Sequence, residues 1–222
     1  ELIATDGTLL PALPRMAWAL WQNPQNRAGK LHLEFSVWRQ VPAEFTVTPA
    51  NTCERLVWKT KLRKGVCYVN DRNYSHDYRL IQAVQASGAS FVLRLHNNAV
   101  MEKLEPARAL TATDMQAGVV EDVRVRLGGK PDGPVGRLVR VESGGHVFLL
   151  FTDRNDLEAE LVALIYRYRW QIELFFKWIK CILGCRHWLA ESPAGMTIQI
   201  YSALIASVLL VLWTGRKPTQ RQ

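Results

Sequence analysis

The chain has 222 residues, of which 48% are hydrophobic and eight are tryptophan. That apolar content excludes an intrinsically disordered chain, and the length allows one large domain or two small ones. The formal net charge of +8 favours a polyanionic partner. Charge alone does not distinguish nucleic acid from an anionic membrane surface.

Residues 1–104 alternate between predicted strands and predicted helices. Short apolar or alternating segments bounded by turn residues are typical of strands, which we expect at residues 2–10, 30–38, 45–48, 66–69 and 90–95. Helical patterns occupy residues 51–62 and 78–86. This order favours an α/β fold with a mixed sheet flanked by helices. It is also the order of a ribonuclease H-like fold, a comparison at the level of the fold alone.

Residues 105–150 differ in pattern from the segment before them. Two alternating segments, 119–127 and 137–142, flank the turn-rich sequence GGKPDGPVG, and a further strand is expected at 146–152. Glycine and proline at a bend between alternating segments indicate a β-hairpin. We therefore predict a β-rich insertion in the α/β core.

Residues 151–222 are expected to complete the α/β core with two helices. The first is a single long helix over 157–183. The second is the apolar stretch 196–213, which contains several polar residues near its start. Because of that polarity, a helix buried in the core of a soluble protein is favoured over a membrane span.

A polar stripe runs along the predicted long helix. Tyr166, Arg169, Glu173, Lys177 and Lys180 fall within an arc of roughly 80° if the helix is continuous. The residues around them are mostly apolar, so the stripe is expected to face a cleft or a ligand. One acid among cations suits a metal ion and phosphates together. The alternative is a solvated stripe with an ordinary Glu173–Lys177 ion pair.

The spacing of this stripe resembles a known motif. Tyr166, two residues, Arg169, three residues, Glu173, six residues and Lys180 are similar to the Y-(2)-R-(3)-E-(6)-K motif of insertion-sequence transposases of the IS-four type. The surrounding YRYRWQIELFFKWIK also resembles that family. The resemblance implies that Glu173 is the third acid of a DDE triad. It also implies that the tyrosine, arginine and lysine lie near phosphates of the transposon end, and we add Lys177 from the same stripe.

The resemblance predicts two aspartates upstream, each on or just after a strand. Asp6 lies in IATDGTLL, similar to the first-acid segment of the family, and Asp71 lies in YVNDRNYS, which resembles its D-R-G-Y segment. Asn73 stands where many relatives have glycine, a mild departure because asparagine tolerates a left-handed backbone. Taken singly, Asp6-Gly7 could be only a turn and Asp71 only a cap.

The resemblance implies a DNA transposase that cleaves strands at transposon ends and transfers them into target DNA. Three carboxylates suit two Mg²⁺ or Mn²⁺ ions, which can activate the attacking oxygen and stabilise the leaving one. Asp6, Asp71 and Glu173 are therefore the expected catalytic residues and metal ligands. The expected partners are double-stranded DNA and a second copy of the chain in a homodimer. The expected location is the bacterial cytoplasm, at the nucleoid during activity, with no membrane involved.

Two alternative functions remain open from the sequence. One is a ribonuclease H-like nuclease without strand transfer, and the other is an inactive DNA-binding remnant of a transposase. The chain, which begins at Glu1, is expected to be a piece of a longer protein. Some family members stack a flipped base on a tryptophan of the β-rich insertion. Residues 105–145 contain no tryptophan here, and Phe148 lies just beyond them, so such a pocket is not predicted.

Overall fold

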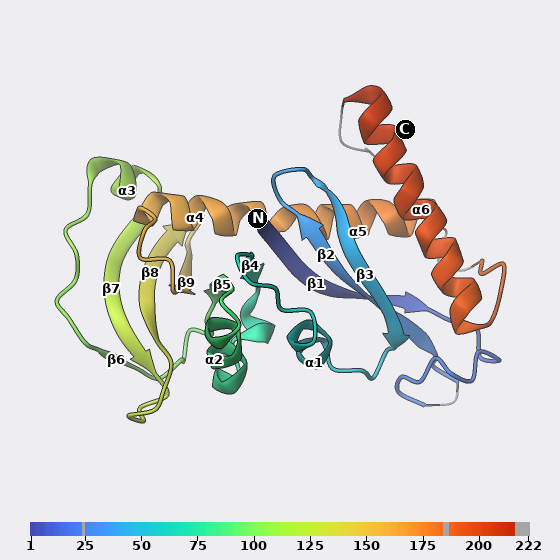
Figure 1. Cartoon of the computed structure of the whole chain (residues 1–222), viewed down its shortest axis with the longest axis horizontal. Coiled ribbons are helices and arrows are strands. Elements are labelled where there is room, and N and C mark those ends of the chain that lie inside the picture. The colour runs from blue at the N-terminus through green and yellow to red at the C-terminus, as the bar shows by residue number, and fades with distance from the viewer. Residues whose placement is uncertain (24, 184–186, 216–222) are drawn as a thin grey trace. The chain divides into compact units, whose positions relative to one another are not determined.

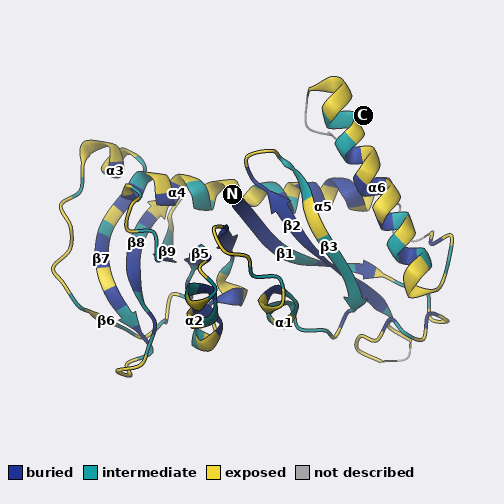
Figure 2. Ribbon diagram, in the orientation of Figure 1, coloured by how far each residue is buried: buried dark blue, intermediate teal, exposed yellow. Residues whose placement is uncertain are grey.

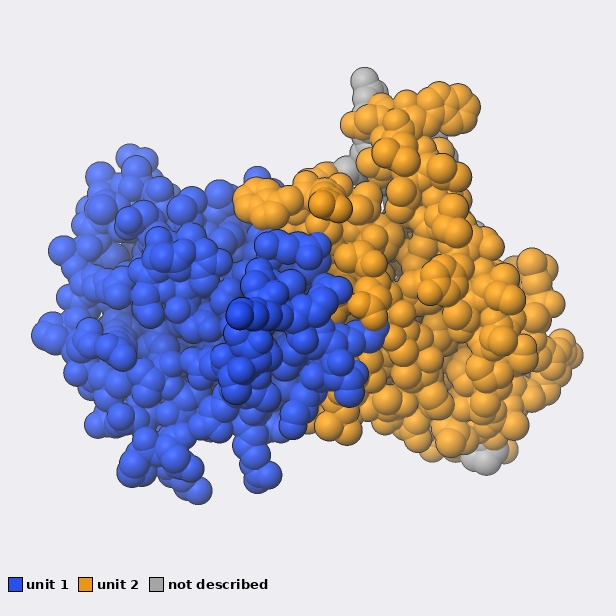
Figure 3. Space-filling model, viewed as in Figure 1, with its two compact units in different colours: residues 1–3, 58–170 blue, residues 4–57, 171–222 orange. Residues whose placement is uncertain are grey.

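The chain folds into two compact units in a computed structural model, which describes residues 1–23, 25–183 and 187–215. Unit 1 comprises Glu1–Ile3 and Trp58–Trp170, and unit 2 comprises Ala4–Val57 and Gln171–Gln222 (Figure 3). The chain therefore enters each unit twice. The domain boundaries expected after residues 104 and 150 are not unit boundaries, and they stay a prediction.

Unit 2 contains an antiparallel hairpin and two helices. The hairpin strands are β2 (Ala28–Ser36) and β3 (Val41–Pro49), and β1 (Leu2–Pro11) follows in the strand order β3-β2-β1. Helix α5 (Trp170–Leu183) packs against β2, since the rings of Phe35 and Phe175 lie 5.3 Å apart. Helix α6 (Pro193–Thr214) packs against β3, with the Phe45 and Tyr201 rings 4.3 Å apart.

Six strands of unit 1 follow one another in the order β4-β5-β9-β8-β7-β6 (Figure 1). Their bounds are β4 (Cys67–Asn70), β5 (Ser90–Arg94), β6 (Met101–Lys103), β7 (Val119–Leu127), β8 (Val135–Ser143) and β9 (His146–Thr152). Strands β4 and β5 are parallel. The pairs β5–β9, β9–β8, β8–β7 and β7–β6 are all antiparallel. The predicted mixed sheet and the β-hairpin of the insertion are therefore confirmed. Gly128 and Gly129 at the bend both have a positive φ, which glycine adopts without strain.

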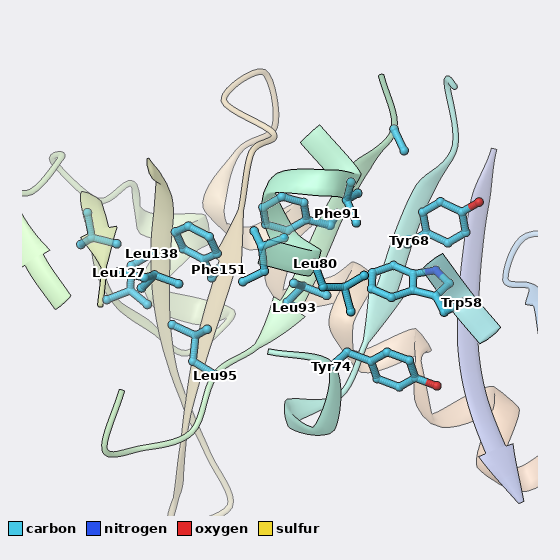
Figure 4. Close-up of a cluster of buried hydrophobic side chains, with 14 of the residues drawn as sticks. Trp58, Tyr68, Tyr74, Leu80, Phe91, Leu93, Leu95, Leu127, Leu138 and Phe151 are labelled. Carbon is cyan, nitrogen blue, oxygen red and sulfur yellow. The ribbon is translucent and has the colours of Figure 1, made fainter. Parts of the chain in front are cut away.

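Helices cover both faces of this sheet. One face carries a buried apolar cluster in which Leu80, Ile81 and Val84 of α2 (Tyr78–Ala86) meet Phe91 and other strand residues (Figure 4). Successive strand residues point to opposite faces, so the neighbours of these residues face the other side. On that other face, α4 (Ala159–Tyr168) contacts the strands β4, β5, β7, β8 and β9. The remaining short elements are α1 (Glu54–Lys59), the 3₁₀ turn η1 (Arg72–Tyr74) and α3 (Ala112–Gln116).

A buried arginine joins the hairpin of the insertion to the segment that leads into α4. The Arg137 Nε donates to Asp122 Oδ1 at 2.7 Å and its Nη2 donates to Oδ2 at 2.6 Å. The two side chains are only 2% and 5% exposed. The remaining nitrogen, Nη1, donates to the carbonyl oxygens of Arg154 and Leu157. This geometry satisfies a buried charge with a bidentate partner and backbone acceptors.

The predicted long helix is wrong, because the structure divides it at Arg169 into α4 and α5. The Arg169 N–H donates to the Tyr166 carbonyl at 3.1 Å, a tight i→i−3 turn, while its backbone stays in the right-handed helical region. The correction places Tyr166 on α4, and Glu173, Lys177 and Lys180 on α5. A tightening of one turn does not change the spacing of apolar residues, so the sequence pattern could not reveal it.

The predicted burial of the C-terminal helix is also wrong. Figure 2 shows α6 exposed or half-buried over most of its length, and its buried residues are Met196, Ile200, Ala203, Leu204 and Ser207. By length and composition alone, this helix could cross a membrane, which is weak evidence for a span. The polar residues that favoured a buried helix do not decide whether a neighbour covers it.

We expect Arg137→Leu to lower the free energy of unfolding by about 3–5 kcal/mol, because it leaves the Asp122 carboxylate buried without its charged partner. Urea denaturation measures this loss. The matched control is Arg124→Leu, since Arg124 pairs with Glu105 on the surface, where both side chains are half exposed. We expect Arg124→Leu to lower the free energy of unfolding by under about 1 kcal/mol. Equal losses in the two variants would show that the buried pair does not anchor the insertion.

Candidate active site

Asp71 lies where β4 ends and the 3₁₀ turn η1 begins. It is half-buried, and its Oδ1 accepts a hydrogen bond from the Asn73 N–H at 2.9 Å. Asp71 therefore does cap a turn, as the simpler interpretation of the sequence suggested, and this bond orients its carboxylate. Asn73 does not need the left-handed backbone that glycine would favour, since Gln40 alone among described non-glycine residues has a positive φ.

Asp6 lies inside strand β1 of unit 2, so the interpretation of Asp6-Gly7 as a turn is wrong. Asp6 is half-buried, and its Oδ1 accepts from the Gly7 N–H at 2.8 Å. A Cβ at position 7 would lie 2.7 Å from the Glu54 carboxyl group, so that carboxyl group lies close to Gly7. Glu54, which forms an ion pair with Lys30 at 3.4 Å, is thus an acid beside Asp6-Gly7 that the sequence pattern did not single out.

Glu173 lies in the first turn of α5, also in unit 2. Lys177 and Lys180 follow at offsets of four and seven residues, within an arc of roughly 60°. Both lysines are exposed and Glu173 is half-buried. The predicted shared face is therefore present for these three residues of α5.

The three acids are thus distributed over the two units, with Asp6 and Glu173 in unit 2 and Asp71 in unit 1. In the described part of the chain, no group of three or more His, Cys, Asp or Glu side chains is arranged to hold a metal ion. The donor set itself fits a hard divalent cation, because all three predicted ligands offer carboxylate oxygens. The triad stays a prediction.

A pocket of about 270 Å³ lies within unit 1, between α4 and the sheet. Its walls combine three arginines with three aromatic rings. The Arg94 guanidinium lies 4.7 Å from the centre of the Phe148 ring, and that of Arg169 lies 5.6 Å from the Tyr166 ring. The Phe148 and Tyr166 rings are 6.2 Å apart. The lining residues are Arg94, Val141, Ser143, Phe148, Leu150, Ala163, Tyr166, Arg167, Arg169 and Trp170.

The sequence pattern missed most of this pocket. Tyr166 and Arg169 were expected at a ligand, but Arg94, Phe148 and Trp170 join them only through the pairing of β5 with β9 and the position of α4. A flipped-base pocket was not predicted, because residues 105–145 contain no tryptophan, and that expectation stays a prediction. The tryptophan of the unit 1 pocket, Trp170, comes from the start of α5.

Burial raises the pKa of the Tyr166 hydroxyl above its ordinary value, and the nearby cations Arg169 and Arg94 partly oppose this rise. Tyr166 therefore enters the pocket as a neutral hydroxyl. The Tyr166 hydroxyl and the Arg94 and Arg169 guanidinium groups offer hydrogen-bond donors to an anion. The Tyr166 and Phe148 rings offer faces on which a planar group can stack. This combination suits the phosphate and base of a nucleotide.

We expect the stabilising effect of Tyr166 to be complete below about pH 10 and to fall as the pH rises further. The sign follows because the unfolded tyrosine loses its proton at lower pH than the folded one, so ionisation favours unfolding. Denaturant titrations of wild type and Tyr166→Phe from pH 8 to 11 measure the effect. Parallel stability curves for the two proteins would contradict a raised pKa.

The fold is shared with a solved transposase. A cryo-EM structure described as a piggyBac transposase synaptic complex with hairpin DNA matches with a TM-score of 0.54 at 11% identity, and the match covers 99% of this chain and 49% of that chain. Such a likeness shows the fold alone, and it confirms the predicted ribonuclease H-like α/β class.

Sequence comparisons give the family. The chain is 30% identical over 210 residues to "Putative transposase y4zB" of Sinorhizobium fredii, covering 92% of this chain and 58% of that protein. It is 27% identical over 200 residues to "Probable transposase for insertion sequence element IS5377" of Geobacillus stearothermophilus, and this match covers 88% of this chain and 52% of that protein. It thus spans between half and three fifths of the length of these relatives. The model of the family described as transposase DDE domain matches residues 1–209, and the chain belongs to this family.

Proposed function

We propose that this chain is the catalytic part of a DNA transposase, which cleaves DNA at the ends of an insertion sequence and joins those ends to target DNA. The observation that carries the proposal is the family match over residues 1–209, within which Asp6, Asp71 and Glu173 occur in the order of a DDE triad. The names of the relatives, which are transposases, support the same activity. The chain spans between half and three fifths of the length of these relatives, so the complete activity is part of the proposal.

Asp6, Asp71 and Glu173 would hold the divalent ions, for which we propose two Mg²⁺ or Mn²⁺. When bound, such ions supply an activated oxygen nucleophile and stabilise the leaving oxygen of a phosphodiester. The residues of the chain contribute the ligands and their orientation. The backbone N–H groups of Gly7 and Asn73, which donate to Asp6 and Asp71, restrict how those carboxylates rotate.

The DNA would be held by Tyr166, Arg169, Lys177 and Lys180. The pocket of unit 1 supports this role for Tyr166 and Arg169, since guanidinium groups bind phosphate through paired donors and aromatic faces stack on bases. Arg94 joins this set because it shares the pocket. Lys177 and Lys180 present exposed charges on α5, where each would act on a phosphate as a point charge.

The partners follow from this function. We propose double-stranded DNA, both the transposon ends and the target, bound by a homodimer of the full-length protein in the bacterial cytoplasm and at the nucleoid. The formal net charge of +8 supports a polyanionic partner.

We expect Glu173→Gln to abolish DNA cleavage by the full-length protein in Mg²⁺ while DNA affinity stays near that of wild type. The amide is nearly isosteric with the carboxylate but is a poorer ligand for a hard cation. A gel assay on end-containing DNA measures cleavage and strand transfer separately. Glu158→Gln is the control, because Glu158 is exposed and forms no capping hydrogen bond at α4. Normal cleavage by Glu173→Gln would exclude Glu173 as a ligand, and cleavage without strand transfer in wild type would favour a simple nuclease.

We expect Arg169→Ala and Lys180→Ala each to weaken binding of transposon-end DNA and to flatten its salt dependence. Each lost phosphate contact should lower the slope of log affinity against log salt by roughly 0.9. Filter binding at several salt concentrations measures the slope for the full-length protein. Arg124→Ala removes the same charge from a surface ion pair outside the pocket and serves as the control. If both variants keep the slope of the control, neither residue contacts a phosphate.

A further inference from the structure

Two stacked histidines lie at the carboxyl ends of β4 and β5. The ring centres of His76 and His96 are 4.0 Å apart, with 36° between the ring planes. Because β4 and β5 are parallel, with Asn70 opposite Leu93, the segments that follow both strands begin at the same edge of the sheet. One of these segments starts with Asp71 and the other carries His96. The two histidines are therefore neighbours of a predicted metal ligand although neither belongs to the triad.

The contact between the two segments is a hydrogen bond next to Asp71 in the chain. The Nε2 of His96 lies 3.1 Å from the Arg72 carbonyl oxygen. A carbonyl oxygen only accepts, so Nε2 must carry the proton and donate. The same oxygen accepts from the Ser75 N–H at 3.3 Å and from the Ser75 hydroxyl at 2.9 Å. The peptide group between Arg72 and Asn73, whose N–H donates to the Asp71 carboxylate, is thus held from two sides.

The rest of the turn is anchored in the apolar core. Tyr74, the last residue of η1, is buried and meets the Trp58 ring edge-on at 5.3 Å between centres. The Tyr74 N–H donates to the Asp71 carbonyl at 3.2 Å, and the Asp71 carboxylate accepts from Asn73. Tyr74 fixes the inner side of the turn. The exposed side, which carries Arg72, depends on His96 and on the His76 ring stacked against it.

We propose that His96, held in place by His76, is a positioning residue that fixes the orientation of the Asp71 carboxylate for a divalent ion. This inference rests on the proposed function, in which Asp71 is a ligand. A half-exposed carboxylate on a short turn binds a cation better when the turn is already in its bound conformation, since less order is then lost on binding. His96, two residues beyond the end of the neighbouring strand β5, supplies that order without touching the ion.

The test is the affinity of the full-length protein for Mn²⁺, measured by electron paramagnetic resonance without DNA. His96→Leu removes the donor to Arg72, and we expect Mn²⁺ to bind about 10-fold more weakly, the low end of the range for residues that support a ligand. His96→Gln keeps an N–H donor near the position of Nε2 and should restore the affinity to within about twofold of wild type. His76→Ala alters only the exposed ring of the stack and should give a smaller loss than His96→Leu.

The control and the reference separate this inference from general destabilisation and from the proposed function. Asp77→Ala removes the N-cap of α2, where Asp77 accepts from the Arg79 N–H, and it should lower thermal stability without changing Mn²⁺ affinity. Asp71→Asn serves as the reference for loss of a ligand. If Asp71→Asn binds Mn²⁺ like wild type, the proposed function fails. If Asp71→Asn loses affinity while His96→Leu and His76→Ala keep it, or if Gln fails to rescue, the positioning role of His96 is wrong.

Discussion

The parallel pairing of β4 with β5 is the constraint on which the functional features of unit 1 depend. A four-residue register from Cys67↔Ser90 to Asn70↔Leu93 brings the carboxyl ends of the two strands together. Asp71 directly follows the last residue of β4. Arg94 is the last residue of β5, and His96 follows it by two residues. The helix α2 that connects the strands buries Leu80, Ile81 and Val84 in the core and so maintains this register. A shift of one residue would turn Arg94 away from Phe148 and α4, because strand residues alternate between faces.

Arg137 differs in its surroundings from Arg94 and Arg169, two other arginines of unit 1. Arg137 is buried and saturated by Asp122 and two carbonyl oxygens, so its charge serves the fold. Arg94 and Arg169 lie instead over the Phe148 and Tyr166 rings in the walls of a pocket. Ring faces attract a guanidinium group while leaving its N–H donors in the ring plane able to bind other groups. Cations held in this way suit a polyanionic ligand such as DNA.

Two acids of the predicted triad accept hydrogen bonds from backbone N–H groups close to them in sequence, and the third lies in the first turn of a helix. Asp6 accepts from Gly7, Asp71 accepts from Asn73, and Glu173 occupies the first turn of α5. Each carboxylate is half-buried, an environment that keeps it accessible to an ion while limiting its rotation. The close approach of Glu54 to Gly7 adds another negative charge near Asp6, and Lys30 balances part of it. Such local ordering of ligands lowers the entropy lost when a cation binds.

The sequence by itself determined the class of fold and the family. Alternating and helical patterns predicted the strands of the mixed sheet other than the short edge strand β6, and the bounds of α2, because these patterns report which side of an element is buried. The spacing from Tyr166 to Lys180 indicated the transposase family, since the residues required by one reaction recur at fixed intervals along a helix. Only the tertiary structure decided the division of that helix at Arg169, the exposure of α6, and the meeting of Arg94, Phe148, Tyr166 and Trp170 in one pocket. It also decided the contact of His96 with Arg72. These features depend on strand pairing and on packing between distant segments, and residue spacing along the chain carries no information about which distant segments will meet.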